Sequence, residues 1–199
     1  AGVTGECIMT ASEQTTGYLE GQLLIAMPAM QDPRFARTVI FMCAHNSDGA
    51  MGLVVNKLFG SLTFSELLEQ VGIEATGVKN QIRVHFGGPV ESGRGFVLHS
   101  PDYVKEGTLV VESDIALTAS VDILKAIAEG QGPRHSFLAL GYAGWGAGQL
   151  DSEIRANGWL NAPADQSLVF DDDLDTKWKR AMATLGVDSG KLSSDVGHA

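Results

Sequence analysis

The chain has 199 residues, of which 44% are hydrophobic and 19% are charged. This length favours one sizeable domain, in which folding buries about 70% of the surface that the unfolded chain exposes. The 24 acidic residues outnumber the 14 basic ones, and the resulting formal net charge of -10 repels polyanions. The composition therefore argues against a disordered chain and against direct binding of nucleic acid.

Cysteine usage and hydropathy narrow the setting in which the protein works. Cys7 and Cys43 are the chain's two cysteines and lie far apart, so neither a disulfide framework nor a CxxC metal site is expected. No apolar run approaches the roughly 20 residues that cross a bilayer, and the N-terminus lacks the pattern of a signal peptide. We therefore expect a cytoplasmic protein without membrane contact.

The first predicted elements are strands. Apolar runs of strand length lie at 22–27 and 38–44, and two prolines in the connection 28–33 separate them. The turn-forming residues 46–49 join the second run to a third at 51–56. This spacing predicts an antiparallel hairpin.

The next element is a helix with clear boundary signals. Thr63 and Glu66 have the spacing of a capping box, while Leu62 and Leu67 occupy the positions of a hydrophobic staple. Gly72 is placed to end the helix.

Further strands are predicted at 82–86, 95–99 and 108–112, because glycine and proline turns separate these apolar runs. A helix over 118–129 follows, since its apolar positions recur on one face and Gly130 stands beyond its end.

In the C-terminal third the pattern predicts two strands and two helices. They lie at 136–142, 149–157, 168–170 and 174–185, in the order strand, helix, strand, helix. The basic cluster Lys177, Lys179 and Arg180 follows a run of aspartates and is interpreted as a solvated face of the last helix.

These elements lack a regular βαβ alternation, which favours an α+β domain with a mostly antiparallel sheet and about four helices. We expect the domain to span 18–187. The Thr-, Glu- and Gly-rich segment 1–17 is predicted to be a flexible N-terminal segment, and 188–199 a frayed C-terminal tail.

One candidate site is the glycine-rich segment after 141, which contains Gly144, Gly146 and Gly148. Backbone N–H groups before a helix can bind an anion. The spacing matches neither phosphate-loop template, however, and Asp151 and Glu153 place negative charge in the first helical turns. Packing is therefore the favoured interpretation, with anion binding as the alternative.

A second candidate surrounds residues 86–90, where a small-ligand pocket is one interpretation and a structural turn the other. The double glycine at a strand end can shape an oxyanion pocket, and histidine and arginine side chains can bind a carboxylate. The residues concerned are His85, Gly87, Gly88, Arg94 and His99.

Signals for catalysis, metals and cofactors are weak. The chain lacks the G-x-S-x-G and HExxH motifs, and Cys43 lies inside an apolar strand where a thiol is usually inert. The acidic run 171–175 lacks the spacing of a calcium-binding loop. We therefore assign no catalytic residue, metal or cofactor.

Six motifs follow one another between residues 18 and 188: GQLLIAMP at 21–28, GLVVNK at 52–57, FGGPV at 86–90, RGFVLHS at 94–100, LTASVDILKAIA at 117–128 and GYAGWGAGQLDSEIRANGWL at 141–160. Together they resemble the YqgE/AlgH family of uncharacterised bacterial proteins, some of which are labelled transcriptional regulators. The resemblance implies an α+β fold with a strongly bent, barrel-like sheet and a bacterial cytoplasmic origin. It implies no catalytic residue, cofactor or ligand.

Two functions follow as hypotheses. The first is a non-enzymatic binding or regulatory protein that acts through a protein partner and not by direct DNA contact. The second is a small-ligand-binding protein or small enzyme with its pocket near Phe86–Val90.

Overall fold

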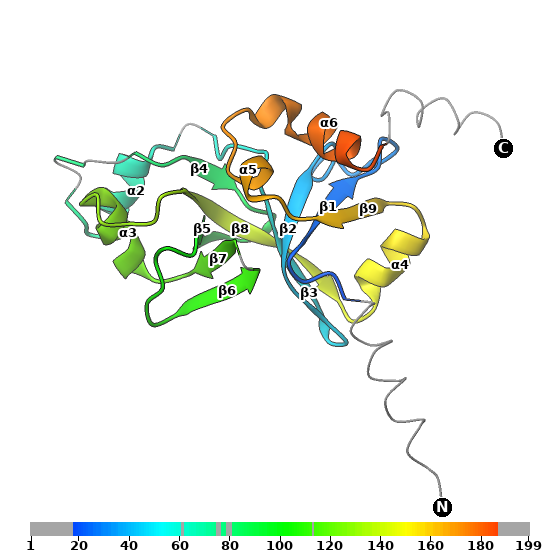
Figure 1. Ribbon diagram of the computed structural model, residues 1–199, viewed down its shortest axis with the longest axis horizontal. Coiled ribbons are helices and arrows are strands. Elements are labelled where there is room, and N and C mark those ends of the chain that lie inside the picture. Colours follow the sequence, from blue (N-terminus) through cyan, green and yellow to red (C-terminus); the bar gives the residue numbers. More distant parts are fainter. Residues whose placement is uncertain (1–17, 61, 75–76, 79–80, 113, 187–199) are drawn as a thin grey trace, which may run out of the picture.

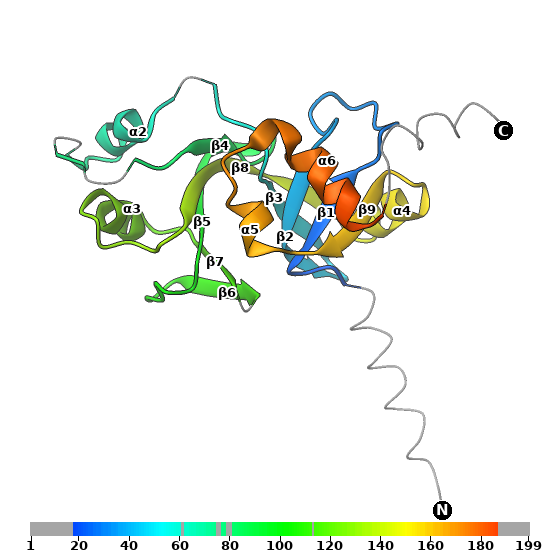
Figure 2. The same cartoon turned by 45° about the horizontal axis from the view of Figure 1, so that its top comes forward.

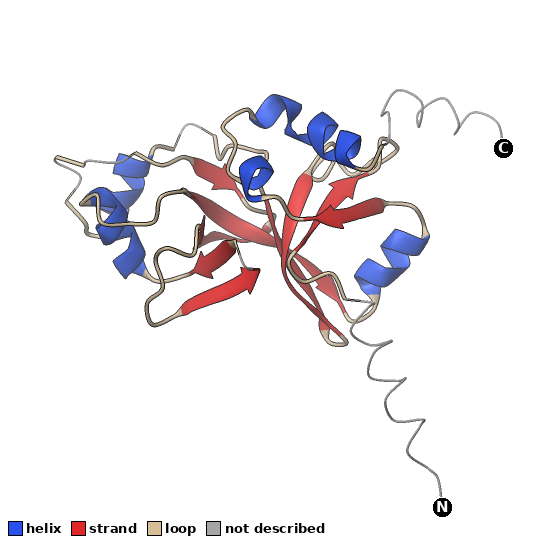
Figure 3. Cartoon of the chain, viewed as in Figure 1, coloured by secondary structure: helices blue, strands red, loops and turns tan. Residues whose placement is uncertain are grey.

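The computed structural model describes residues 18–60, 62–74, 77–78, 81–112 and 114–186 of the chain (Figure 1). The predicted terminal segments, 1–17 and 188–199, lie outside the described residues. Strands and helices are combined in one domain, which confirms the expected α+β class (Figure 3).

Nine strands of the described chain form one sheet. Their order is β6-β7-β5-β8-β3-β2-β1-β9, and β4 lies off this path against β8. The β4–β8 pair is parallel and the other described pairs are antiparallel. The strands are β1 (Gln22–Ala26), β2 (Val39–Asn46), β3 (Gly49–Val54), β4 (Val84–Phe86), β5 (Val90–His99), β6 (Thr108–Glu112), β7 (Ile115–Thr118), β8 (Ser136–Gly146) and β9 (Trp159–Pro163).

Strand β8 joins the two halves of the sheet. Its 11 residues pair with β5 up to Tyr142 and with β3 from Ala143 onward. Gly141 lies at this changeover with φ 75°, a backbone conformation that favours glycine. The sheet curls around β8 into a half-barrel (Figure 1).

Five helices lie within the described residues, one more than expected. In Figure 2, α5 and α6 close the open side of the half-barrel, α2 and α3 lie together at one end and α4 lies at the other. They are α2 (Phe64–Gln70), α3 (Val121–Ala128), α4 (Gln149–Arg155), α5 (Gln166–Val169) and α6 (Leu174–Thr184).

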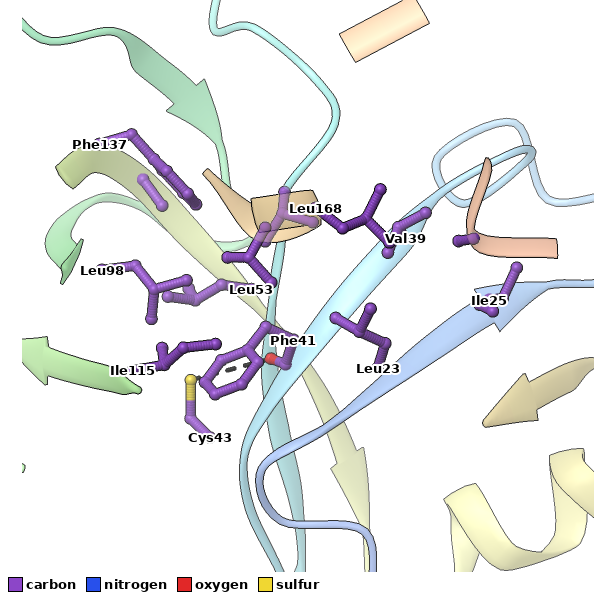
Figure 4. Close-up of a cluster of buried hydrophobic side chains, with 14 of the residues drawn as sticks. Leu23, Ile25, Val39, Phe41, Cys43, Leu53, Leu98, Ile115, Phe137 and Leu168 are labelled. Atoms are coloured by element: carbon purple, nitrogen blue, oxygen red, sulfur yellow. Dashed lines mark hydrogen bonds between the residues drawn. The ribbon is translucent and has the colours of Figure 1, made fainter. Parts of the chain in front are cut away.

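Alternation of side chains along the strands divides the core into three clusters. The interior cluster fills the half-barrel beneath α5 and α6, and Figure 4 shows part of it around Phe41, Leu53 and Leu98. The α2–α3 cluster and the α4 cluster lie on the outer side of the sheet, beneath the helices that name them. Phe64 and Ile123 belong to the α2–α3 cluster, whereas Leu150 belongs to the α4 cluster.

The local signals of the first half are confirmed. β2 and β3 form the predicted antiparallel hairpin, with Asn46 opposite Gly49. The capping box of α2 is complete, because Thr63 Oγ1 accepts from the Glu66 N–H and Glu66 Oε2 accepts from the Thr63 N–H.

In the C-terminal third, one predicted strand is wrong and one observed strand was not predicted. Residues 168–170 do not form a strand, because Asp165 accepts a hydrogen bond from the Ser167 N–H and starts the short helix α5. Strand β9 was not expected, since WLNAP has weak strand propensity. Its five residues pair with β1 at the edge of the sheet, where Pro163 is tolerated.

Candidate functional site

The two histidines predicted as ligand residues point to opposite sides of the sheet. β4 and β5 pair with opposite edges of β8. His85 stacks on Phe137 of the interior cluster, with ring centroids 4.0 Å apart. Leu98 also belongs to that cluster, so its neighbour His99 faces the outer side. The structure therefore does not bring His85 and His99 into one pocket.

His99 has a hydrogen-bond partner for each ring nitrogen inside the protein. Nε2 lies 2.8 Å from Thr118 Oγ1, and Nδ1 lies 2.8 Å from the Ser100 carbonyl oxygen. The ring is buried, and burial lowers its pKa below the usual value. A ligand at His99 would have to replace one of these bonds.

Arg94 lies in a bulge of β5, apart from both histidines. Val90 pairs with Tyr142 of β8 and Gly95 pairs with Leu140. The chain therefore advances five residues along β5 but only two along β8, and the residues between Val90 and Gly95 bulge out of the sheet. The Arg94 guanidinium is exposed, lies 3.4 Å from Glu91 Oε2 and stands 5.1 Å from the centre of the Phe96 ring. These contacts occupy Arg94 at the surface.

The double glycine allows two stretches of backbone to approach closely. A Cβ atom at Gly87 would collide with the Gly141 carbonyl, and one at Gly88 would collide with the Tyr142 backbone. Both glycines are buried against β8. Their geometry accounts for FGGPV as a packing motif.

The glycine-rich segment is largely strand. Gly144 and Gly146 belong to β8, and Gly148, with φ 72°, is the residue that precedes α4. The Gly146 N–H already donates to Gln149 Oε1 at 3.0 Å. The residue after α4 with left-handed backbone geometry is Asn157, with φ 61°.

Two tryptophans fix this strand-to-helix joint. The indole N–H groups of Trp145 and Trp159 both donate to Glu153 Oε1, at 3.4 and 3.1 Å. Their rings meet edge to face, with centroids 6.1 Å apart. The segment therefore supports α4 on the sheet.

A cavity of about 370 Å³ does include one predicted residue, His85. It lies between β4 with the residues before it, the start of β8, and the loop from α5 to α6. Its lining residues are Gln81, Ile82, Arg83, His85, Arg134, His135, Ser136, Phe137, Phe170, Asp171 and Asp172.

His85 contributes a buried, unpartnered nitrogen atom to this cavity. Its side chain is buried, and Nδ1 has no hydrogen-bond partner among the described residues. Burial lowers the pKa of the ring to about 3, and the charges of Lys177 and Arg83 act in the same direction. The Val55 backbone acts in the opposite direction and raises the pKa. An unsatisfied buried nitrogen is destabilising, which makes it a candidate for ligand contact.

Lys177 is buried beside His85, contrary to the solvated face that we predicted. Its Nζ donates to the carbonyl oxygens of Val55 and Val169, at 3.1 and 2.9 Å. Burial lowers its pKa to about 8. The helical spacing could have indicated this burial. Lys177 lies three residues after Leu174 and four before the buried Ala181, and residues at these spacings share one face of a helix.

The acidic residues of the cavity already have partners. Asp171 accepts from Arg180 Nη1 at 2.6 Å, and this bond lowers the pKa of the carboxyl group. The Asp172 carboxylate lies 3.7 Å from Arg83 Nε and is mostly exposed. Arg83 Nη1 donates to the Asp172 carbonyl at 2.7 Å, which ties the α5–α6 loop to the residue before β4.

Two reactive side chains, those of His85 and Cys43, are poorly suited to acid–base or nucleophilic chemistry. His85, with its low pKa, is a weak base at neutral pH. Burial raises the pKa of Cys43 to about 12, so its thiol stays protonated. In the part of the chain that the structure describes, no three metal-ligating side chains gather, and no helix has the length and hydropathy to span a membrane.

Comparisons with known proteins agree with the motifs. The DUF179 family model, described as AlgH-like, matches residues 23–190. A UPF0301 protein of Afipia carboxidovorans is 56% identical over 197 residues, covering 95% of this chain and 94% of that protein. A UPF0301 protein of Rhodospirillum rubrum is 52% identical over 190 residues, covering 96% and 99%.

Two solved structures share the fold. The solution structure of AlgH from Pseudomonas aeruginosa has a TM-score of 0.75 and 43% identity, covering 92% of this chain and 96% of that chain. A crystal structure of a Corynebacterium diphtheriae protein has a TM-score of 0.67 and 22% identity, covering 83% and 86%. The second likeness concerns the fold alone.

Proposed function

We propose that this chain, which belongs to the AlgH-like family, acts as a binding protein for a small anionic ligand. The site is the cavity beside His85. The observation that carries the proposal is the unpartnered, buried Nδ1 of His85 at a cavity that Arg83 and Arg134 also line, in a chain whose formal net charge is -10.

The cavity lining holds two arginines and two aspartates, and Lys177 and Arg180 add positive charge around it. Arg83 and Arg134 line it, and the two charges that act on the His85 ring are those of Lys177 and Arg83. Arg180 neutralises the Asp171 carboxylate. An anion that enters meets guanidinium groups, which suit carboxylates and phosphates.

An anion would also give the unpartnered ring nitrogen a role. A negative charge near His85 opposes the effect of Lys177 and Arg83 and favours the protonated ring. Nδ1 of the protonated ring can then donate to the anion. Ligand binding would thus be coupled to the uptake of a proton.

Sulfate is a suitable first probe, because its charge is constant above pH 3. Binding is measured by NMR titration at constant ionic strength, for the wild type, Arg83→Gln, Arg134→Gln and Arg155→Gln. Arg155, on the exposed end of α4, is the matched control. We expect sulfate affinity to fall about tenfold or more in either cavity variant, since one charged hydrogen bond contributes roughly 1.5–3 kcal/mol. Equal affinity in all four proteins would contradict the proposal.

A regulatory role would follow from the position of the cavity. Phe170 to Asp172 both line it and connect α5 to α6, the helices that close the half-barrel. Lys177 fixes α6 to Val55, next to the same ring. Ligand binding would therefore alter the outer surface of α6, where we propose that a protein partner responds. Sulfate-induced NMR shifts confined to the cavity, without any in α6, would count against this second step.

A further inference from the structure

A second hollow adjoins the His85 cavity. It is an open groove of about 450 Å³ that shares three lining residues, Gln81, Ile82 and Arg83, with the cavity. Its other lining residues are mainly apolar: Leu58, Gly60, Leu62, Thr63, Phe64 and Val84. The two hollows therefore differ in chemistry and meet along one short segment.

The alternation of side chains around β4 explains this difference. Val84 belongs to the α2–α3 cluster and Ile82 packs against it. His85 stacks in the half-barrel interior, and Arg83 reaches the α5–α6 loop. One extended segment thus presents His85 to the cavity and Val84 to the groove, while Gln81, Ile82 and Arg83 border both hollows.

Leu58 marks the apolar end of this arrangement. Its side chain is 53% exposed, although its backbone forms a bridge with His85. The backbone around it is fixed, because the Phe59 N–H donates to the Val84 carbonyl and the Phe86 N–H to the Lys57 carbonyl. An apolar side chain is thereby held at the surface, one strand spacing from the cavity histidine.

We infer that the ligand is an amphipathic anion, whose charged head lies in the His85 cavity and whose apolar tail crosses the segment 81–83 into the groove beside Leu58. The inference rests on the proposed function and adds the chemical class of the ligand. It is supported by charge complementarity at one end, an apolar lining at the other, and the continuity of the two hollows through Arg83.

A series of straight-chain carboxylates tests the inference. Acetate, butanoate, hexanoate and octanoate carry the same head and differ only in the tail. Complete burial of one methylene corresponds to about a fourfold gain in affinity, so in an open groove we expect about a twofold gain per methylene. 1-Octanol, with the same tail length and no charge, is the probe for binding by the tail alone.

Two variants locate the tail. Leu58→Ser removes an exposed apolar side chain from the groove, and Val110→Ser removes one of similar exposure (47%) from β6. We expect Leu58→Ser to weaken octanoate binding about fivefold and to leave acetate binding unchanged. Val110→Ser should change neither. Circular dichroism confirms that each variant is folded.

The outcomes separate the inference from the proposed function. If acetate and octanoate bind equally and both depend on Arg134, the anion site stands and the amphipathic ligand is excluded. If the affinity still increases with tail length in Leu58→Ser as it does in the wild type, the tail binds elsewhere and the inference is overturned. Binding of 1-octanol as tight as that of octanoate also overturns it. If no carboxylate binds and sulfate also fails, both proposals fall.

Discussion

Replacing His85 by phenylalanine tests whether the buried histidine lowers the free energy of unfolding of the protein. The ring stack on Phe137 can persist in the variant, and the unpartnered Nδ1 disappears. Loss of the unsatisfied nitrogen stabilises the variant by about 1–3 kcal/mol, and loss of the favourable effect of the Val55 backbone on the ring partly offsets this gain. We therefore expect His85→Phe to be about 1 kcal/mol more stable than the wild type at pH 7.

The pH dependence gives this prediction a second readout. In the folded protein His85 has a pKa of about 3, whereas a histidine in the unfolded chain titrates near 6.5. Between these values the unfolded chain binds one more proton, so the unfolding free energy of the wild type falls as pH decreases. From pH 7 to 5 the decrease is about 2 kcal/mol, because the slope approaches roughly 1.4 kcal/mol per pH unit below pH 6.5.

Urea denaturation of both proteins at pH 7, 6 and 5 measures this effect. Comparing the two proteins in the same buffers cancels the titration of the other groups. The stability gap in favour of His85→Phe should widen by about 2 kcal/mol at pH 5. A gap that is independent of pH, or a variant much less stable at pH 7, would refute the account of His85 as a buried neutral ring.

Two further predictions concern stability. Lys177→Met removes the donor to the carbonyls of Val55 and Val169, so we expect a loss of about 1–3 kcal/mol at pH 7. Because the Lys177 pKa is lowered to about 8, the stability of the wild type relative to the variant should increase as pH rises from 8 to 10. A difference in unfolding free energy, measured in urea, that stays constant over this pH range would argue against a buried Lys177. Gly141→Ala should lower the unfolding free energy by more than about 3 kcal/mol, because its φ is 75° and a Cβ would collide with the Gly88 carbonyl. Gly93→Ala, in open space, is the control, and thermal unfolding at equal scan rate should show little change for it.

Sequence reasoning predicted those parts of the fold that local signals specify. The β2–β3 hairpin follows from a turn between two apolar runs, and the α2 capping box from the spacing of Thr63 and Glu66. Strand β9 escaped prediction because its stability comes from pairing with β1, over a hundred residues earlier in the chain. Tertiary pairing thus overrode a weak local propensity.

The candidate site shows the same division. The sequence drew attention to His85, but also to Arg94 and His99, which the fold directs elsewhere. Lys177 was missed as a neighbour of His85, since 92 positions separate them in the chain and only the packing of α6 on the half-barrel brings them together. Residue types indicate possible chemistry, whereas the curl of the sheet decides which of them share a cavity.

Titration of the His85 ring tests most directly whether an anion binds beside it. The His85 imidazole is followed by NMR from pH 3 to 8, with sulfate or with sodium chloride at the same ionic strength. We predict that sulfate raises the His85 pKa in the wild type and not in Arg134→Gln. An unchanged His85 pKa, or an equal rise in both proteins, would contradict anion binding beside His85.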